Sequence, residues 1–101
     1  MDELYLDNPP KTVKDAVEMI ITIWSPKALK DLASKSKADL WLCHFGIGLW
    51  IRNNFGLWEG NKALMRDAGS NIQDDVSMII IEALRKKLRE KQNERTRETK
   101  R

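Results

Sequence analysis

The residue types that could carry out chemistry are concentrated between residues 41 and 58. This segment holds three of the four tryptophans, the only histidine and the only cysteine of the 101-residue chain. Cys43 beside His44 suggests a nucleophile and its base. However, adjacent residues on a helix point about 100° apart, so they cannot form the hydrogen bond that activates a thiol. We therefore expect Cys43 to be a small buried core residue and His44 to lie at a helix interface, and we assign no catalytic residue.

Metal and cofactor sites are not predicted either. One histidine, one cysteine and scattered carboxylates lack the ligand spacing of a zinc site. Asp74 and Asp75 stand near an expected helix start, where carboxylates complement the helix dipole. Gly46 and Gly48 do not form a phosphate-binding loop, because no strand precedes them and no Lys-Ser/Thr pair follows. The sequence thus predicts a protein without a metal, a cofactor or a catalytic centre.

A polar and aromatic group at the end of this segment is the first candidate for binding. Arg52 and Asn53 stand at an expected helix end, and Trp58 and Asn61 follow in a turn. Arg and Trp are enriched among interface hot spots, and a large aromatic side chain in a loop costs solubility unless it is buried or used. These four are therefore the candidate partner-binding residues. The alternative is that Arg52 and Asn53 fasten the turn by binding its carbonyls, while Trp58 plugs the end of the bundle.

The charge distribution indicates a second candidate surface. Residues 85–101 contain nine Lys or Arg against three Glu, a balance of +6, whereas the preceding residues have a balance of −3. A basic terminal segment can attract nucleic acid, and the candidate contacts are Arg85, Lys86, Arg89, Arg95 and Arg97. The alternative is a solvated helix end, because three glutamates at four-residue spacing interrupt the positive run.

Capping and turn residues divide the chain into about five helices. Thr12, Ser25, Ser36 and Asn61 are of the types that cap helix N-termini, and apolar residues recur after each at three- and four-residue spacing. No segment alternates apolar and polar residues as a hairpin strand would. The sequence predicts an all-α fold, a single small bundle with a charged C-terminal extension. The expected helices cover about residues 13–24, 26–33, 37–54, 61–68 and 71–88.

The expected helix over residues 37–54 has apolar or small residues on nearly all sides, so we expect it to be the central, buried one. Gly46 and Gly48 weaken such a helix by about 1 kcal/mol each relative to Ala, a cost that close approach of a neighbouring helix would explain. The apolar stripe of the last helix ends at Leu88. We therefore expect a helical domain over residues 9–92 and a basic, frayed or disordered tail over residues 93–101.

Length and composition restrict the class of protein. The chain is 42% hydrophobic and 33% charged, which is typical of a soluble globular domain. No apolar run approaches the roughly 18 residues of a membrane span, and a single cysteine suits a reducing compartment. We expect a cytoplasmic, non-enzymatic protein-interaction module, of the adaptor, inhibitor or immunity type, without a membrane partner. The protein partner is not identified by the sequence. Nucleic-acid binding and homodimer formation stay open as alternatives.

The segment from His44 to Trp58 resembles the signature of an uncharacterised family of small bacterial and phage proteins. That signature is close to His-x-Gly-Leu-Gly-x-Trp-Ile-Arg-Asn-x-x-Gly-Leu-Trp. Ile47, in place of Leu, and Phe55, where Trp is common, are mild departures from the family pattern. The segments Pro10–Val13 and Asp74–Ile81 are also similar, so the resemblance covers roughly residues 9–88. It implies a bacterial or phage origin and a small helical domain, and it supplies no catalytic residues.

Overall fold

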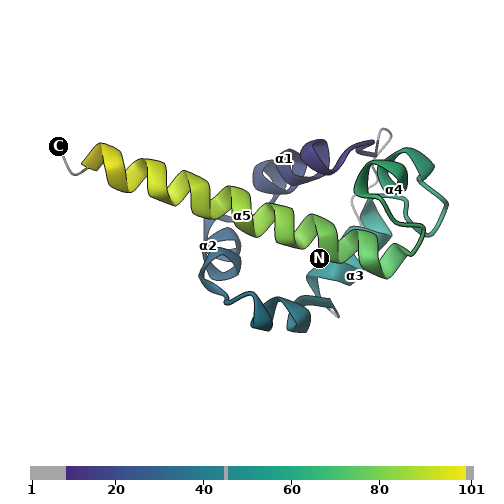
Figure 1. Cartoon of the computed structure of the whole chain (residues 1–101), viewed down its shortest axis with the longest axis horizontal. Coiled ribbons are helices and arrows are strands. Elements are labelled where there is room, and N and C mark those ends of the chain that lie inside the picture. Colours follow the sequence, from purple (N-terminus) through teal and green to yellow (C-terminus); the bar gives the residue numbers. More distant parts are fainter. Residues whose placement is uncertain (1–8, 45, 100–101) are drawn as a thin grey trace.

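The computed structural model describes the backbone of residues 9–44 and 46–99, and the side chains of residues 9–42 and 46–92. These ranges contain helices and no strand, so the predicted all-α fold is confirmed. Five α-helices and one 3-10 helix follow one another along the chain (Figure 1). They are α1 (Val13–Ile23), α2 (Pro26–Ser34), the 3-10 helix η1 (Ala38–His44), α3 (Ile47–Asn54), α4 (Lys62–Ala68) and α5 (Gln73–Thr99).

The predicted caps begin three of the α-helices. Thr12, Ser25 and Asn61 each accept a hydrogen bond on the side-chain oxygen from the backbone N–H three residues later, at 3.0, 3.2 and 3.3 Å. Each bond satisfies one of the N–H groups that a helix start leaves without a partner. Gly69 ends α4 in the left-handed conformation, with φ of 84°, which glycine adopts without steric cost. Local sequence thus determines these boundaries.

The prediction of a single helix over residues 37–54 is wrong, because the segment forms two elements, η1 and α3. η1 and α3 are separated at Gly46, the N-cap of α3, whose φ of −97° and ψ of −82° depart from helix geometry. Close packing does not explain this glycine, since an added Cβ would meet no atom of the described residues within 4 Å. Gly48, in contrast, is buried in the first turn of α3.

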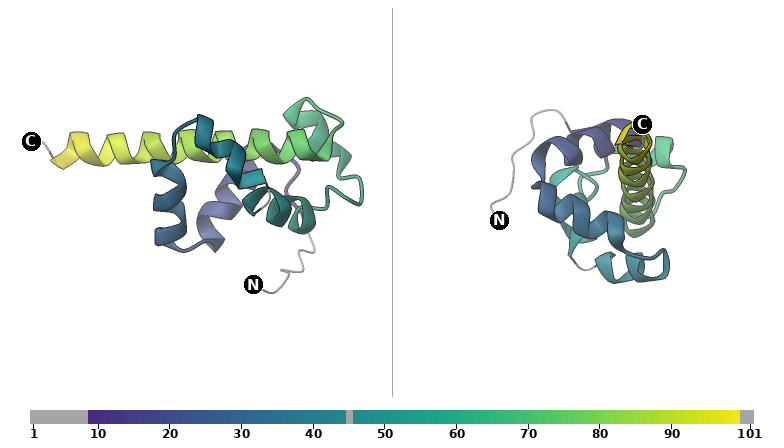
Figure 2. Two further views of the ribbon diagram at one scale, coloured as in Figure 1. Left: turned by 90° about the horizontal axis from the view of Figure 1, so that it is seen from below. Right: turned by 90° about the vertical axis from the view of Figure 1, so that its left-hand side faces the viewer.

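The central helix is α5, not the segment 37–54. α5 contacts α1, α2, η1, α3 and α4, and the view along its axis shows the other elements grouped around it (Figure 2). Its 27 residues correspond to a length of about 40 Å, most of the 48 Å longest dimension of the molecule. Its buried side chains among the described residues are Val76, Ser77, Ile80, Ile81, Leu84 and Leu88. Of the apolar stripe expected from the sequence, Ile79 and Ala83 are only half-buried, whereas Ser77 and Ile81 are buried outside that stripe.

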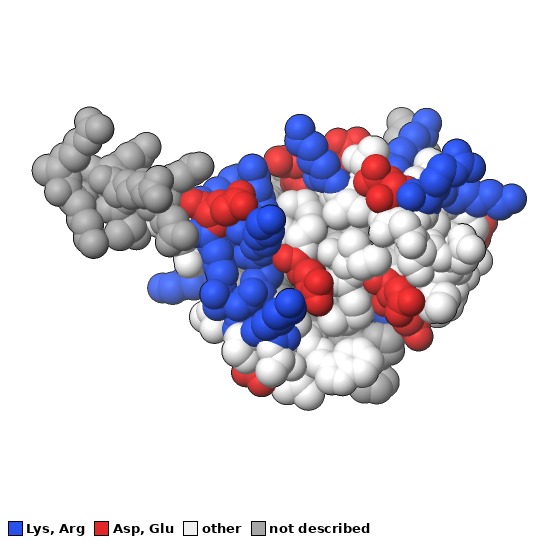
Figure 3. Space-filling model, in the orientation of Figure 1, with Lys and Arg blue, Asp and Glu red and all other residues white. Residues whose placement is uncertain are grey.

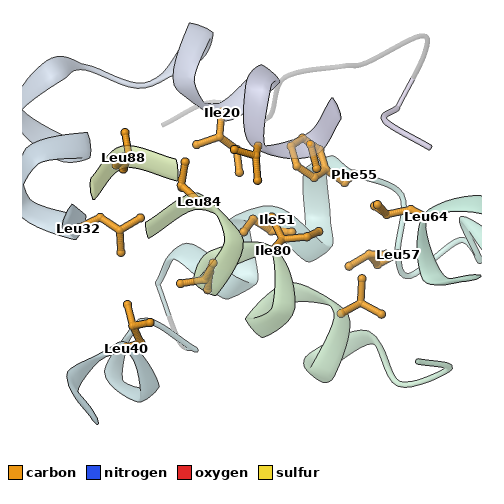
Figure 4. Packing of buried hydrophobic residues seen from close by; sticks show 14 of the residues in the cluster. Ile20, Leu32, Leu40, Ile51, Phe55, Leu57, Leu64, Ile80, Leu84 and Leu88 are labelled. Carbon is orange, nitrogen blue, oxygen red and sulfur yellow. The ribbon is translucent and has the colours of Figure 1, made fainter. Parts of the chain in front are cut away.

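Side chains from every element pack together in the core against α5 (Figure 4). η1 contributes Leu40, and the end of α3 and the turn after it contribute Ile51, Phe55 and Leu57. Phe55 and Leu57 are fully buried, so these two residues close this end of the bundle, the place suggested above for Trp58. The packing fixes α3 and its following turn against the N-terminal half of α5.

The C-terminal end of α5 lies beyond the core, since Leu88 is the last buried side chain among the described residues. We predict that truncation after Gln92 leaves the domain folded and changes its melting temperature by no more than about 2 °C, because no packed apolar side chain is removed. Circular dichroism melting of the full and shortened chains measures this. A much lower melting temperature would show that residues 93–101 stabilise the core.

Candidate functional site

Arg52 is buried and connects α3 to the start of α5. Its side chain is 5% exposed, and its Nη1 donates to Ser77 Oγ at 2.9 Å. Its Nε lies 3.4 Å from Asp74 Oδ1, and Ser77 Oγ in turn donates to the Asp74 backbone carbonyl at 2.8 Å. Two segments that are far apart in sequence, Arg-Asn and Asp-Asp-Val-Ser, therefore meet in one network.

Trp58 lies on the surface directly beside this network. Its side chain is 56% exposed, yet its Nε1 donates to Asn53 Oδ1 at 2.7 Å, and its ring centroid is 5.8 Å from Arg52 Cζ. Leu49 stands one turn before Asn53 on α3 and is 44% exposed. We call these three residues, Leu49, Asn53 and Trp58, the Trp58 face. It is an exposed apolar surface with an aromatic ring fixed at its end.

Asn61 holds the turn from the inside. Its Nδ2 donates to the carbonyls of Phe55 and Pro10, at 2.8 and 2.9 Å, while its Oδ1 caps α4. One half-buried amide thus joins the N-terminal lead-in, the end of α3 and the start of α4. Of the four residues predicted to bind a partner, Asn53 and Trp58 are exposed. Arg52 is buried against the Trp58 ring, and Asn61 is half-buried and fastens the turn.

Leu49 was not among the predicted site residues, although the sequence contained a signal for it. Leu49 precedes Asn53 by four residues, and residues at this spacing share a helix face. The roles of Asp74 and Ser77 as partners of Arg52 had no such signal, because they are 22 and 25 residues away along the chain. The helix-start explanation for Asp74 was therefore incomplete.

Two basic side chains of α5, Arg85 and Arg89, have partners within the fold. Arg85 Nε donates to the Lys35 carbonyl at 2.7 Å. Arg89 donates through Nε to the Ala33 carbonyl at 3.0 Å and through Nη2 to the Lys35 carbonyl at 3.2 Å. These carbonyls belong to the end of α2, where a helix leaves C=O groups without partners. Two of the candidate nucleic-acid contacts thus also have a structural role.

Other basic side chains lie near the contact between α5 and the end of α2. Lys86 is exposed, and Lys and Arg side chains gather where α5 passes α2 (Figure 3). The side chains of Arg95 and Arg97 lie outside the described residues, as do those of Cys43 and His44. The predictions for these four residues therefore stay predictions.

A metal site and a membrane-spanning helix are both absent from the described part of the chain. No group of three or more His, Cys, Asp or Glu side chains there could hold a metal ion. None of the helices in the same residues has the length and apolar character needed to cross a bilayer.

The fold and these contacts define a small all-α domain in which a long C-terminal helix is surrounded by four shorter α-helices and η1. Residues 9–88 match the sequence model of a family described as a domain of unknown function, DUF6794, and the chain belongs to this family. No curated protein and no solved structure matches the chain significantly. The family match covers the residues that carry the resemblance noted from the sequence.

Proposed function

We propose that this domain is a non-enzymatic protein-interaction module that docks onto a partner protein through the Trp58 face. The observation that carries the proposal is the state of Trp58, which is more than half exposed although two contacts fix its ring. An indole held in this way loses little conformational entropy when a partner covers it. Trp is also enriched among the residues that dominate interface energetics.

The neighbours of Trp58 also support docking of a partner on this face. Leu49 adds exposed apolar area on the same face, and the polar Asn53 places hydrogen-bonding groups between the two, the mixed composition typical of interfaces. Arg52 is anchored by α5, so the face is supported by a rigid element. The proposal includes the adaptor, inhibitor and immunity types of protein, a cytoplasmic location and a bacterial or phage origin.

Nucleic-acid binding is the second candidate function, supported by the basic side chains gathered on α5 (Figure 3). Arg85 and Arg89 donate to backbone carbonyls at the end of α2, and both Lys86 and Arg89 are exposed. Binding to generic DNA or RNA that falls steeply between low and moderate salt would favour this candidate.

The test of docking compares the native chain with Trp58→Ala. We expect Trp58→Ala to weaken partner binding at least about tenfold. In alanine scans, truncation of a hot-spot Trp typically costs about 2 kcal/mol or more of binding free energy. The melting temperature should fall by only a few degrees, roughly what loss of an exposed aromatic contact costs. Tagged chains recover the partner from a native lysate, and binding is then measured with the purified pair.

Two further variants separate docking from folding. Trp58→Phe keeps an aromatic ring but loses the hydrogen bond to Asn53, so it should retain part of the affinity for the partner. Lys30→Ala changes an exposed residue of α2 outside the Trp58 face and should bind as the native chain does. If stability and binding fall together in Trp58→Ala, the tryptophan is a structural residue and the proposal is wrong.

A further inference from the structure

A groove lies between η1 and the middle of α5, away from the Trp58 face residues. It encloses about 530 Å³, within the range of volumes that hold ligand groups or several side chains. Its apolar lining comes from Leu40 of η1 and from Ile79 and Ala83 of α5. Trp41 and Leu42 follow Leu40 directly in η1 and are 70% and 75% exposed. The groove therefore has an apolar floor beside an apolar surface.

The rim of the groove is mainly basic. Lys37 stands on the η1 side, and Lys86 and Arg89 stand on the α5 side. Arg85 and Arg89 bind backbone carbonyls, which are neutral acceptors, so these bonds do not cancel the guanidinium charge. The band of Lys and Arg in Figure 3 lies where α5 passes α2, beside a broad uncharged area.

Two carboxylates limit the positive region along α5. Glu82 and Glu90 line the groove four residues before and after Lys86, which is about one helical turn on either side. Along α5, the charged side chains that line the groove are thus basic in the middle and acidic at both ends. An occupant with this complementary pattern carries acidic groups at its centre and apolar groups facing the floor.

We propose that this groove binds an acidic amphipathic segment of a partner protein. Its carboxylates face Lys37, Lys86 and Arg89, and its apolar side chains cover the floor. The inference rests on the proposed function only in taking the occupant to be a protein. A nucleic acid is a poorer match, because its regularly spaced phosphates would approach Glu82 and Glu90 and would leave the apolar floor uncovered.

The test uses defined probes with the full 101-residue chain. One labelled synthetic peptide of about 18 residues, five helical turns, has Leu on one face and, on the other face, Glu in the middle turns and Gln at both ends. A second peptide replaces each Glu by Lys, and single-stranded and duplex DNA of similar charge complete the set. We expect fluorescence anisotropy to show at least about tenfold tighter binding of the Leu–Glu peptide than of any other probe at moderate salt.

Charge-reversal pairs locate the binding. Lys37→Glu with Lys86→Glu should weaken binding of the Leu–Glu peptide at least about tenfold, and the neutral pair Lys37→Gln with Lys86→Gln should weaken it less. Lys14→Glu with Lys27→Glu makes the same change in net charge at exposed residues of α1 and α2 that do not line the groove. This control pair should bind within about twofold of the native chain. Circular dichroism checks that every variant is folded.

Three outcomes would overturn the groove as the site. They are equal weakening in the groove pair and the control pair, tighter binding of DNA than of the Leu–Glu peptide, and no measurable binding of that peptide by the native chain. Trp58→Ala separates this inference from the proposed function. This variant should leave the affinity for the Leu–Glu peptide unchanged and lower the affinity for the natural partner. The groove proposal and the docking proposal can therefore fail independently.

Discussion

Arg52→Ala should lower the free energy of unfolding by about 3 kcal/mol, as expected for loss of a buried, hydrogen-bonded side chain. The Arg52 side chain is buried, and its guanidinium donates to the buried Ser77 Oγ. Removal of the side chain takes that donor away and leaves the space of its packed stem unfilled. The ion pair with Asp74 contributes less, because the Asp74 side chain is 55% exposed and water screens the attraction. Urea unfolding of the native and variant chains gives the difference.

Three matched variants show how much each interaction of Arg52 contributes to the free energy of unfolding. Arg52→Met keeps a stem of similar length without the hydrogen bonds. Ser77→Ala removes both the acceptor of the Arg52 bond and the donor to the Asp74 carbonyl. Asp74→Asn removes the exposed charge and should cost under about 1 kcal/mol. A native-like stability of Arg52→Ala, or an Asp74→Asn variant as unstable as Arg52→Ala, would contradict this account of the network.

The same network couples the core of the fold to its proposed binding face. The Arg52 guanidinium that binds α5 also lies under the Trp58 ring. A change at Arg52 therefore affects stability and the position of the indole together, whereas a change at Trp58 affects the exposed ring alone. For this reason Arg52 variants report on folding, and Trp58 variants report on docking.

The parts of the fold that could be predicted from the sequence are those with short-range causes. Thr12, Ser25 and Asn61 cap helices through hydrogen bonds to the backbone three residues later, so a window of four residues contains the whole interaction. The apolar stripe of α5 is likewise repeated within one helix. Each of these features was predicted and is present.

The break at Gly46 and the central position of α5 could not be predicted from local sequence in this way. Apolar residues at three- and four-residue spacing fit one long helix as well as a 3-10 helix followed by an α-helix. The burial of Ser77 and Ile81 depends on the elements that surround α5. Arg52 meets Ser77 across 25 residues, and Arg89 meets Ala33 across 56. Such pairs depend on the packing of helices, which no local pattern contains.

The second large effect is expected at Gly48. We predict that Gly48→Leu lowers the free energy of unfolding by about 3 kcal/mol, the upper part of the range for overpacking. Gly48 is buried in α3, and α3 packs against both α5 and η1. Its φ is not positive, so a glycine is not required for backbone conformation, and we expect limited space in this buried position to be the reason for its presence. A gain in helix propensity of up to about 1 kcal/mol offsets part of the loss.

Gly46→Leu is the matched control, since it adds the same side chain two residues earlier. Gly46 is exposed, and an added Cβ would have no neighbour within 4 Å among the described residues. Its effect should stay below about 1 kcal/mol, the scale of a changed N-cap residue. Thermal and urea unfolding of both variants measure the contrast. Equal stability of the two would mean that α3 can shift away from its neighbours, and that Gly48 does not mark a close contact between helices.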